Sequence, residues 1–531
     1  MAETKKTKTE AAESAASAKK TVKKTTTPKK STTTKKTSTT KKSTTTKKTT
    51  TKKTTQKKAA APAKKIMFVA SECLPFCATG GLGEVIGSLP PALASLGCEV
   101  SVFVPLYKSI GNEYREKMEF LKCFDIHVAW RTLYCGVFKL VKDGVSYYFI
   151  DNEYYFGRDG LYGHFDDAER YAYFCTAVLE CWNQLSYVPD VVHAHDWQTA
   201  LIPIYLNAKY YYPDVKTVFT IHNIEYQGKY DPYILGDVFG LGTEALHFVE
   251  YEGCINLMKG AIACSNKVTT VSPSYAGEIQ TEYFAHGLDK ILCEHNYKLT
   301  GILNGIDEKG YNPANGELIV KKFTADDLSG KEECKASLQR EAALPEDANI
   351  PVVAMITRLV THKGLDLVVN VADELLSNCN CQLIILGTGD KQYEDFFKGL
   401  EYRHPGKMKL FLAFDKALAR RIYSGADLFL MPSKSEPCGL AQMISSRYGT
   451  VPIVRKTGGL GDSIHDCGYG EGNGFVFDNY NAQEMLHTIY RAITLFHDKN
   501  NFTNLKKHIM NIDFSWSKSG TDYLNMYNDL Y

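Results

Sequence analysis

The sequence predicts an α/β protein built from two doubly wound domains. Its 531 residues, 44% of them hydrophobic, are enough for two large domains rather than one. In both halves, short and nearly continuous apolar runs alternate with helical stretches, a pattern typical of parallel strands covered on both faces. The strands are expected at residues 66–71, 100–105, 191–193, 218–222 and 268–272, and again at 352–356, 383–386, 410–413, 428–431 and 453–455.

Four segments follow from this pattern. Residues 1–63 form a tail, residues 64–308 the first domain, residues 309–510 the second domain, and residues 511–531 a C-terminal segment. Asp415 is expected to begin a helix in the second domain, and residues 514–530 look like an amphipathic helix that packs back onto the first domain. Because ligands bind at the carboxyl ends of such sheets, we expect a deep cleft between the two domains.

The tail differs sharply from the rest of the chain in charge. Residues 1–65 contain 21 Lys and three Glu, so of the 62 basic and 60 acidic residues, 41 and 57 lie in the remainder. A Lys/Thr-rich segment with no apolar face cannot offset the entropy of ordering, so we predict that it is disordered. Its partner is left open: a polyanion such as nucleic acid, the acidic body of a neighbouring molecule, or none.

The sequence also indicates the cellular compartment. No signal peptide precedes the tail, and no apolar run is long enough to span a membrane. The fifteen cysteines are scattered without a paired framework, as expected of reduced thiols. We therefore predict a cytoplasmic protein without a membrane partner.

Two similar glycine-rich turns follow strands, at residues 78–84 and 456–462. Glycines at a strand-to-helix turn let backbone amides approach an anion, and the following helix start favours negative charge. One such turn is a weak signal and is as readily explained by a tight turn. A second copy at the equivalent place favours a shared anion site between the domains.

Charged side chains follow strands of the second domain. Arg358 and Lys363 follow the strand that opens this domain, where two cations can hold a diphosphate and stabilise the leaving group. Glu436 follows a later strand and can accept hydrogen bonds from sugar hydroxyls, or alternatively cap a helix. Cys438 lies in the same turn but has no obvious base partner that would make it a nucleophile.

Histidines end two strands of the first domain. His193 and His195 are two positions apart, and we expect them to point to opposite faces of the strand, which would make them poor ligands of one metal. His222 ends the next strand. The chain has no Asp-x-Asp pair of the kind that holds a metal–diphosphate complex. We predict neither a metal nor a cofactor, and we assign the phosphate contacts to fixed cations and backbone amides.

Taken together, these motifs resemble those of bacterial glycogen synthases and plant starch synthases, which are retaining glycosyltransferases with the GT-B fold of two Rossmann-like domains. The resemblance runs from about residue 65 to residue 531 and omits the tail. It rests on motifs in the family's order: Ser71-Glu72 with Pro75, Thr79-Gly80-Gly81-Leu82, His193 to Trp197, His222-Asn223 with Tyr226-Gln227-Gly228, Val271-Ser272-Pro273, Leu303-Asn304-Gly305-Ile306-Asp307, Arg358 with Lys363-Gly364-Leu365-Asp366, Glu436-Pro437-Cys438-Gly439-Leu440 and Thr457-Gly458-Gly459-Leu460.

The resemblance implies roles for individual residues. The first domain would be catalytic and face the acceptor, and the second would bind the nucleotide sugar. His222 would position the transferred glucose, Glu436 would bind its hydroxyls, Arg358 and Lys363 would bind the donor's phosphates, and Asp196 would line the sugar site. The implied substrate-binding residues are Thr79, Gly80, Gly81, Asn304, Phe414, Tyr162, Cys438, Gly439, Leu440, Thr457, Gly458 and Gly459.

Three positions depart from the family pattern. Ala78 stands where a lysine usually precedes the first Thr-Gly-Gly, which removes one contact to the donor's phosphate. Glu84 replaces an aspartate, and Phe414 replaces a tyrosine that packs on the donor's base. Losing one charge-assisted contact costs about 1.5–3 kcal/mol of binding.

The resemblance implies transfer of glucose from ADP-glucose to the non-reducing end of an α-1,4-glucan such as glycogen, with retention of configuration. Two alternatives stay open at this point. The donor is UDP-glucose instead, or the chain is a glucan-binding regulatory relative whose catalysis is reduced by Ala78.

Overall fold

The computed structural model describes residues 63–469 and 471–531. The tail predicted for residues 1–63 therefore lies, except for Ala63, outside the described residues. Within the described part of the chain, no helix is both long enough and apolar enough to cross a membrane.

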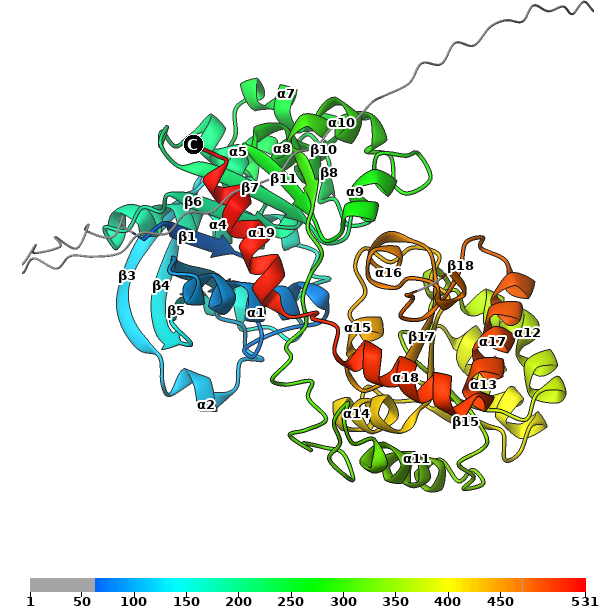
Figure 1. Cartoon of the computed structure of the whole chain (residues 1–531). Helices are drawn as coiled ribbons and strands as arrows, with labels where there is room; N and C mark the ends of the chain where they lie inside the picture. Colours follow the sequence, from blue (N-terminus) through cyan, green and yellow to red (C-terminus); the bar gives the residue numbers. More distant parts are fainter. Residues whose placement is uncertain (1–62, 470) are drawn as a thin grey trace, which may run out of the picture. The chain divides into compact units, whose positions relative to one another are not determined.

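A nine-stranded sheet organises the first half of the described chain (Figure 1). Its strand order is β12-β11-β7-β6-β1-β2-β5-β4-β3. From β12 to β5 every neighbouring pair is parallel, whereas β4 pairs antiparallel with both β5 and β3. The strands are β1 (Lys65–Val69), β2 (Glu99–Pro105), β3 (Glu119–Val128), β4 (Arg131–Lys142), β5 (Val145–Asp151), β6 (Val191–His195), β7 (Lys216–Ile221), β11 (Lys267–Thr270) and β12 (Leu299–Gly301).

Helices and a small second sheet complete this half. The antiparallel sheet has the order β8-β10-β9. Its strands are β8 (Lys229–Tyr230), β9 (Glu250–Tyr251) and β10 (Cys254–Asn256). The helices are α1 (Gly81–Ser95), α2 (Asn112–Arg115), α3 (Glu153–Phe156), α4 (Asp167–Gln184), α5 (Leu201–Ala208), α6 (Ile234–Asp237), α7 (Leu246–Val249), α8 (Leu257–Cys264), α9 (Pro273–Glu278) and α10 (Asp289–Glu294).

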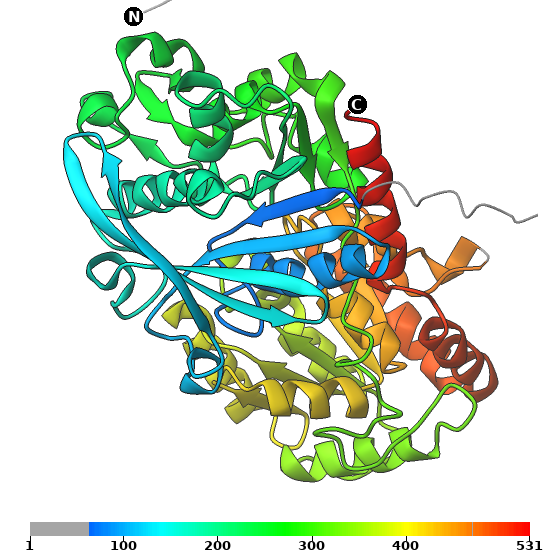
Figure 2. The same ribbon diagram turned by 90° about the vertical axis from the view of Figure 1, so that its left-hand side faces the viewer.

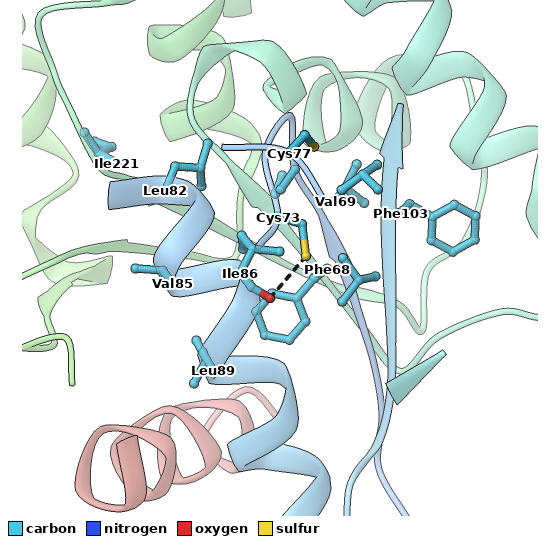
Figure 3. Packing of buried hydrophobic residues seen from close by; sticks show 14 of the residues in the cluster. Phe68, Val69, Cys73, Cys77, Leu82, Val85, Ile86, Leu89, Phe103 and Ile221 are labelled. Carbon is cyan, nitrogen blue, oxygen red and sulfur yellow. Dashed lines mark hydrogen bonds between the residues drawn. The ribbon is translucent and has the colours of Figure 1, made fainter. Parts of the chain in front are cut away.

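The core beside the first glycine-rich turn forms between β1 and α1 (Figure 3). Leu82, Val85, Ile86 and Leu89 recur at helical spacing and are buried, so one face of α1 is apolar. The Cys73 thiol donates a hydrogen bond to the carbonyl oxygen of Ile86 at 3.6 Å. This packing fixes the start of α1 at the carboxyl end of β1.

A six-stranded sheet organises the second half, in the order β15-β14-β13-β16-β17-β18, with every pair parallel. The strands are β13 (Val352–Ile356), β14 (Gln382–Leu386), β15 (Met408–Phe411), β16 (Leu428–Met431), β17 (Val451–Arg455) and β18 (Phe475–Phe477). The helices are α11 (Ser329–Glu341), α12 (Leu365–Asn378), α13 (Lys391–Arg403), α14 (Lys416–Gly425), α15 (Ala441–Arg447), α16 (Gly458–Ser463), α17 (Ala482–His497) and α18 (Lys499–Met510).

All ten strands expected from the sequence are present, with ends that shift by up to two residues. The helix expected after Asp415 is also confirmed: the Asp415 carboxylate accepts hydrogen bonds from the amides of Ala417 and Leu418. Five strands of the two large sheets were not predicted, namely β3, β4, β5, β12 and β18. β3 and β4 lie at one edge of the first sheet (Figure 2), and β3 is largely exposed, so its residues do not form a continuous apolar run.

The last helix, α19 (Trp516–Asn528), packs against the first half of the chain beside α1 (Figure 1). The Tyr527 hydroxyl lies 2.7 Å from Nδ1 of His193 in β6. Just before α19, the Ile306 amide donates to the Phe514 carbonyl oxygen at 2.8 Å. A β-carbon at Gly305 would come within 2.7 Å of the Trp516 amide nitrogen, so the two segments that connect the halves touch backbone to backbone. The domain boundaries at residues 308 and 510 remain predictions.

Candidate active site

The first glycine-rich turn is held by a buried carboxylate. Glu72, just after β1, accepts hydrogen bonds from the amides of Thr79 and Gly80 at 2.7 and 3.1 Å and from the Thr79 hydroxyl at 2.6 Å. The Tyr162 hydroxyl also donates to Glu72, at 2.8 Å. Through Glu72, Tyr162 is thus connected to the first glycine-rich turn. The Gly80 amide, which the resemblance expects to face the donor, already has a partner within the chain.

Asp196 connects the ends of β6 and β7. Its backbone has a φ of +56°, a conformation that is uncommon for a residue other than glycine. One carboxylate oxygen accepts from the His222 amide at 2.7 Å and is 3.4 Å from the Asn223 amide. Burial raises the pKa of Asp196 to about 7, although both amides act to lower it. Asp196 thus orients the backbone of His222.

Three histidine rings lie together at these strand ends. His193 and His195 point to the same face of β6, with ring centroids 4.1 Å apart. The prediction of opposite faces was wrong, because side chains alternate along a strand with a period of two residues. Nδ1 of His195 lies 3.0 Å from Nε2 of His222. Burial lowers the pKa of His222 to about 3, and it lowers the pKa values of His193 and His195 well below their usual range.

In the second half, Lys363 and Glu436 form an ion pair. Nζ of Lys363 lies 2.9 and 2.7 Å from the two carboxylate oxygens of Glu436, and the Ser433 hydroxyl donates to Glu436 at 2.9 Å. Burial alone would raise the pKa of Glu436, but Lys363 and Ser433 together hold it below its ordinary value. The alternative of a helix-capping role finds no support, because no backbone amide among the described residues donates to this carboxylate.

Arg358 follows β13 and is exposed. Its guanidinium lies 3.4 Å from Nε2 of His362. Burial, together with the nearby charges of Lys363 and Arg358, lowers the pKa of His362, while Glu436 and Glu225 act to raise it. Glu225 belongs to the loop that follows His222 and Asn223 in the first half. Its charge therefore acts on the same histidine, His362, as the charges of Arg358 and Lys363. Arg358 is free to contact an incoming anion.

The second glycine-rich turn meets a carboxylate from the other half of the chain. Glu278, at the end of α9, accepts hydrogen bonds from the Thr457 hydroxyl at 2.9 Å and from the Gly458 amide at 2.8 Å. The Gly459 amide donates to the carbonyl oxygens of Glu436 and Pro437 at 3.2 and 3.1 Å. The turn therefore packs against the backbone of Glu436.

Cys438 and Asn304 lie beside this turn. Burial raises the pKa of the Cys438 thiol to about 12, against the influence of Asn304, so the thiol is protonated and unsuited to act as a nucleophile. Asn304 is buried, and its side-chain oxygen has no hydrogen-bond partner among the described residues. Gly439 has a φ of +68°, and together with Leu440 it leads into α15.

Phe414 lies in the loop between β15 and α14 with 87% of its surface exposed. An exposed aromatic face at the carboxyl end of a parallel strand suits stacking on a planar base. Ala78 is also exposed, so a longer side chain would find space there.

The contacts that three residues make in the candidate site were not predicted from the sequence. Glu72 was recognised only as part of a motif, and His195 was placed on the wrong face. Glu278 was not singled out, because its partners lie about 180 positions further along the chain. Across residues 63–469 and 471–531, no group of three or more His, Cys, Asp or Glu side chains is arranged to hold a metal ion.

Comparison with known proteins gives a consistent result. Residues 65–294 match the starch synthase catalytic domain family, and residues 338–507 match the group 1 glycosyl transferases. A glycogen synthase of Clostridium botulinum is 50% identical over 475 residues, which are 88% of this chain and 99% of the relative. The chain belongs to the glycogen and starch synthase family. A Bacillus anthracis glycogen synthase is 47% identical over 473 residues, with the same coverage.

Solved structures agree with this family membership. The catalytic domain of starch synthase IV from Arabidopsis thaliana, bound to ADP and acarbose, is 34% identical with a TM-score of 0.81, covering 88% of this chain and 99% of that one. A sucrose-phosphate synthase of Thermosynechococcus elongatus, 15% identical with a TM-score of 0.56, shares the fold over the same fractions. The GT-B prediction is confirmed, and this family member is a hexosyltransferase.

Proposed function

We propose that this family member transfers glucose from ADP-glucose to the non-reducing end of an α-1,4-glucan, with retention of configuration. The observation on which the proposal rests is the Lys363–Glu436 ion pair at the carboxyl end of the second sheet. It pairs a cation suited to a diphosphate with a carboxylate suited to sugar hydroxyls. The relatives named glycogen synthase and the ADP-bound starch synthase support the same assignment.

In the proposed reaction, the bond between the glucosyl C1 and the diphosphate oxygen breaks as the acceptor's 4-hydroxyl bonds to C1 on the same face. The hydroxyl proton passes to the departing diphosphate, and ADP leaves. Arg358 and Lys363 stabilise the charge that develops on the diphosphate. Glu436 and His222 orient the glucose. Because Asp196 has its carboxylate engaged by the His222 amide, we assign it to positioning rather than to attack on C1.

The direct test incubates the purified protein with glycogen and either ADP-glucose or UDP-glucose, and measures nucleoside diphosphate release and glucan elongation side by side. We expect both products from ADP-glucose, at a higher kcat/KM than from UDP-glucose. Preference for UDP-glucose would reject the donor assignment. Glucan binding without release from either donor would favour the second candidate, a glucan-binding relative, which is motivated by Ala78.

A paired substitution tests the two residues at the centre of the proposal. Lys363→Ala and Glu436→Gln should each lower kcat at least about 100-fold, because each removes a charge that acts on the reacting groups. Urea unfolding should show only a small change for Glu436→Gln, which preserves the shape of the side chain, and a larger loss for Lys363→Ala, which leaves the buried Glu436 without its cation. Lys434 is an exposed lysine nearby, so Lys434→Ala is the matched control and should leave turnover nearly unchanged. Unchanged turnover in either variant would refute that residue's role.

A further inference from the structure

A chain of neutral histidines leads from the candidate sugar site into the core. His222 is partly exposed, and its Nε2 lies 3.0 Å from Nδ1 of His195. His195 is fully buried, stacks on Phe68 with ring centroids 5.5 Å apart, and its Nε2 has no hydrogen-bond partner among the described residues. His193 pairs separately, through Nδ1 with Tyr527 and through Nε2 with Thr220.

The 3.0 Å contact needs one proton between the two nitrogens, because both rings are neutral at pH 7. If His222 donated this proton from Nε2, neutral His195 would carry its own proton on Nε2, as a buried N–H without an acceptor. If His195 donates from Nδ1, its Nε2 retains only a lone pair. Buried N–H groups without a partner are rarer than acceptors without one, so the second arrangement is favoured.

We propose that His195 is a positioning residue that donates a hydrogen bond from Nδ1 to Nε2 of His222 and so keeps the proton of His222 on Nδ1. Nδ1 of His222 has no partner among the described residues and is not buried, so this N–H is available to a ligand. The inference rests on the proposed function in one respect, namely that the ligand is the transferred sugar. His222 would then act as a hydrogen-bond donor to a sugar hydroxyl and not as a proton acceptor.

The tautomer can be measured without any substrate. In protein labelled with ¹⁵N-histidine, two-bond ¹⁵N–¹H correlation spectra at pH 7.5 report which ring nitrogen carries the proton, and a His222→Gln variant assigns the signals. We expect His222 to be protonated on Nδ1. Protonation on Nε2, or on both nitrogens, would overturn the proposal. Because this result does not depend on turnover, an inactive protein with the expected tautomer would contradict only the proposed function.

A double-mutant cycle then tests whether His195 acts through His222. His195→Leu removes the donor, and we expect it to lower kcat roughly tenfold. The same change in a His222→Gln background should lower kcat no further, whereas a purely structural role would give additive losses and would overturn the proposal. His195→Asn keeps an N–H near the position of Nδ1 and should restore most of the rate. If the Leu variant does not fold, the tautomer and the Asn variant still test the idea.

His193→Leu is the matched control, because His193 is equally buried on the same strand but bonds to Tyr527 and Thr220. It should reduce stability to a similar extent while the His222 proton stays on Nδ1. If the proton moved to Nε2 in His193→Leu but stayed on Nδ1 in His195→Leu, then His193 and not His195 would position His222, and the proposal would be overturned.

Discussion

At the scale of single residues, three carboxylates of the candidate site have specific partners. Glu436 pairs with Lys363, Glu72 with the amides of the first glycine-rich turn, and Asp196 with the His222 amide. A buried charge is tolerated only when it is paired or hydrogen-bonded. A donor diphosphate therefore enters a site whose carboxylates already have partners, and the exposed Arg358 adds a cation with no carboxylate partner among the described residues.

Ala78 provides a gain-of-function prediction. The position is exposed at the start of the first glycine-rich turn, so Ala78→Lys should place an ammonium group within reach of the donor's phosphates. One charge-assisted hydrogen bond contributes about 1.5–3 kcal/mol, which corresponds to roughly 10- to 150-fold in affinity. We expect KM for ADP-glucose to fall by about tenfold or more. Ala78→Met, of similar length without charge, should give no such gain. Equal KM values for the two variants would show that the diphosphate does not approach this turn.

The raised pKa of Asp196 predicts that the free energy of unfolding depends on pH. Its folded pKa of about 7 lies above the ordinary value of about 3.9, so the folded chain binds a proton that the unfolded chain has released. The stability this residue contributes is fully present below about pH 4 and is lost as the pH rises through about 7. Asp196→Asn removes this titration and should gain stability, relative to the original protein, between pH 5 and pH 8.

Urea unfolding at several pH values across that window measures the effect. The exposed Asp159→Asn serves as the control, for which we expect a difference from the original protein that does not change with pH. The account of Asp196 is contradicted if the difference in free energy of unfolding between Asp196→Asn and the original protein also does not change with pH.

At the scale of elements, ten parallel strands could be predicted because burial on both faces leaves continuous apolar runs, as in Val352–Ile356. The parallel strands β5, β12 and β18 were missed, and β12 and β18 are only three residues long. The largely exposed β3 leaves no such run, and the strands of the small β8-β10-β9 sheet are too short to form one. Within the site, residues at strand ends such as Arg358 and Glu436 could be selected from sequence. Glu278 could not, because its partners are brought to it only by the packing of α9 on α16.

The second glycine-rich turn predicts a position-specific effect of alanine. Gly458 has a φ of +44°, and a β-carbon there would clash with the carbonyl oxygen of Glu436. Gly458→Ala should therefore destabilise the fold by about 1–3 kcal/mol and lower kcat, because the backbone of Glu436 must move. Gly461→Ala, in the same helix α16, would meet only the flexible Lys456 side chain, at 3.2 Å, and should change both quantities little. Equal effects of the two substitutions, measured by urea unfolding and by turnover, would contradict this account of the turn.

At the scale of the described molecule, the two halves are joined by specific polar contacts as well as by the chain itself. The Ser272 hydroxyl donates to the Pro437 carbonyl oxygen at 2.8 Å, and the Asp462 carboxylate accepts from the amide and hydroxyl of Ser274 at 2.8 and 2.6 Å. Together with Glu278, these contacts link α9 to both the Glu436 turn and the second glycine-rich turn. A movement of one half relative to the other would therefore displace the residues that we propose bind the donor.

A crystal structure of this protein with ADP and a maltooligosaccharide tests the central claim most directly. The account predicts the diphosphate within hydrogen-bond distance of Arg358 and Lys363, the base stacked on Phe414, and His222 and Glu436 on opposite sides of the sugar position. A diphosphate bound elsewhere, with Arg358 and Lys363 directed away from it, would contradict the account.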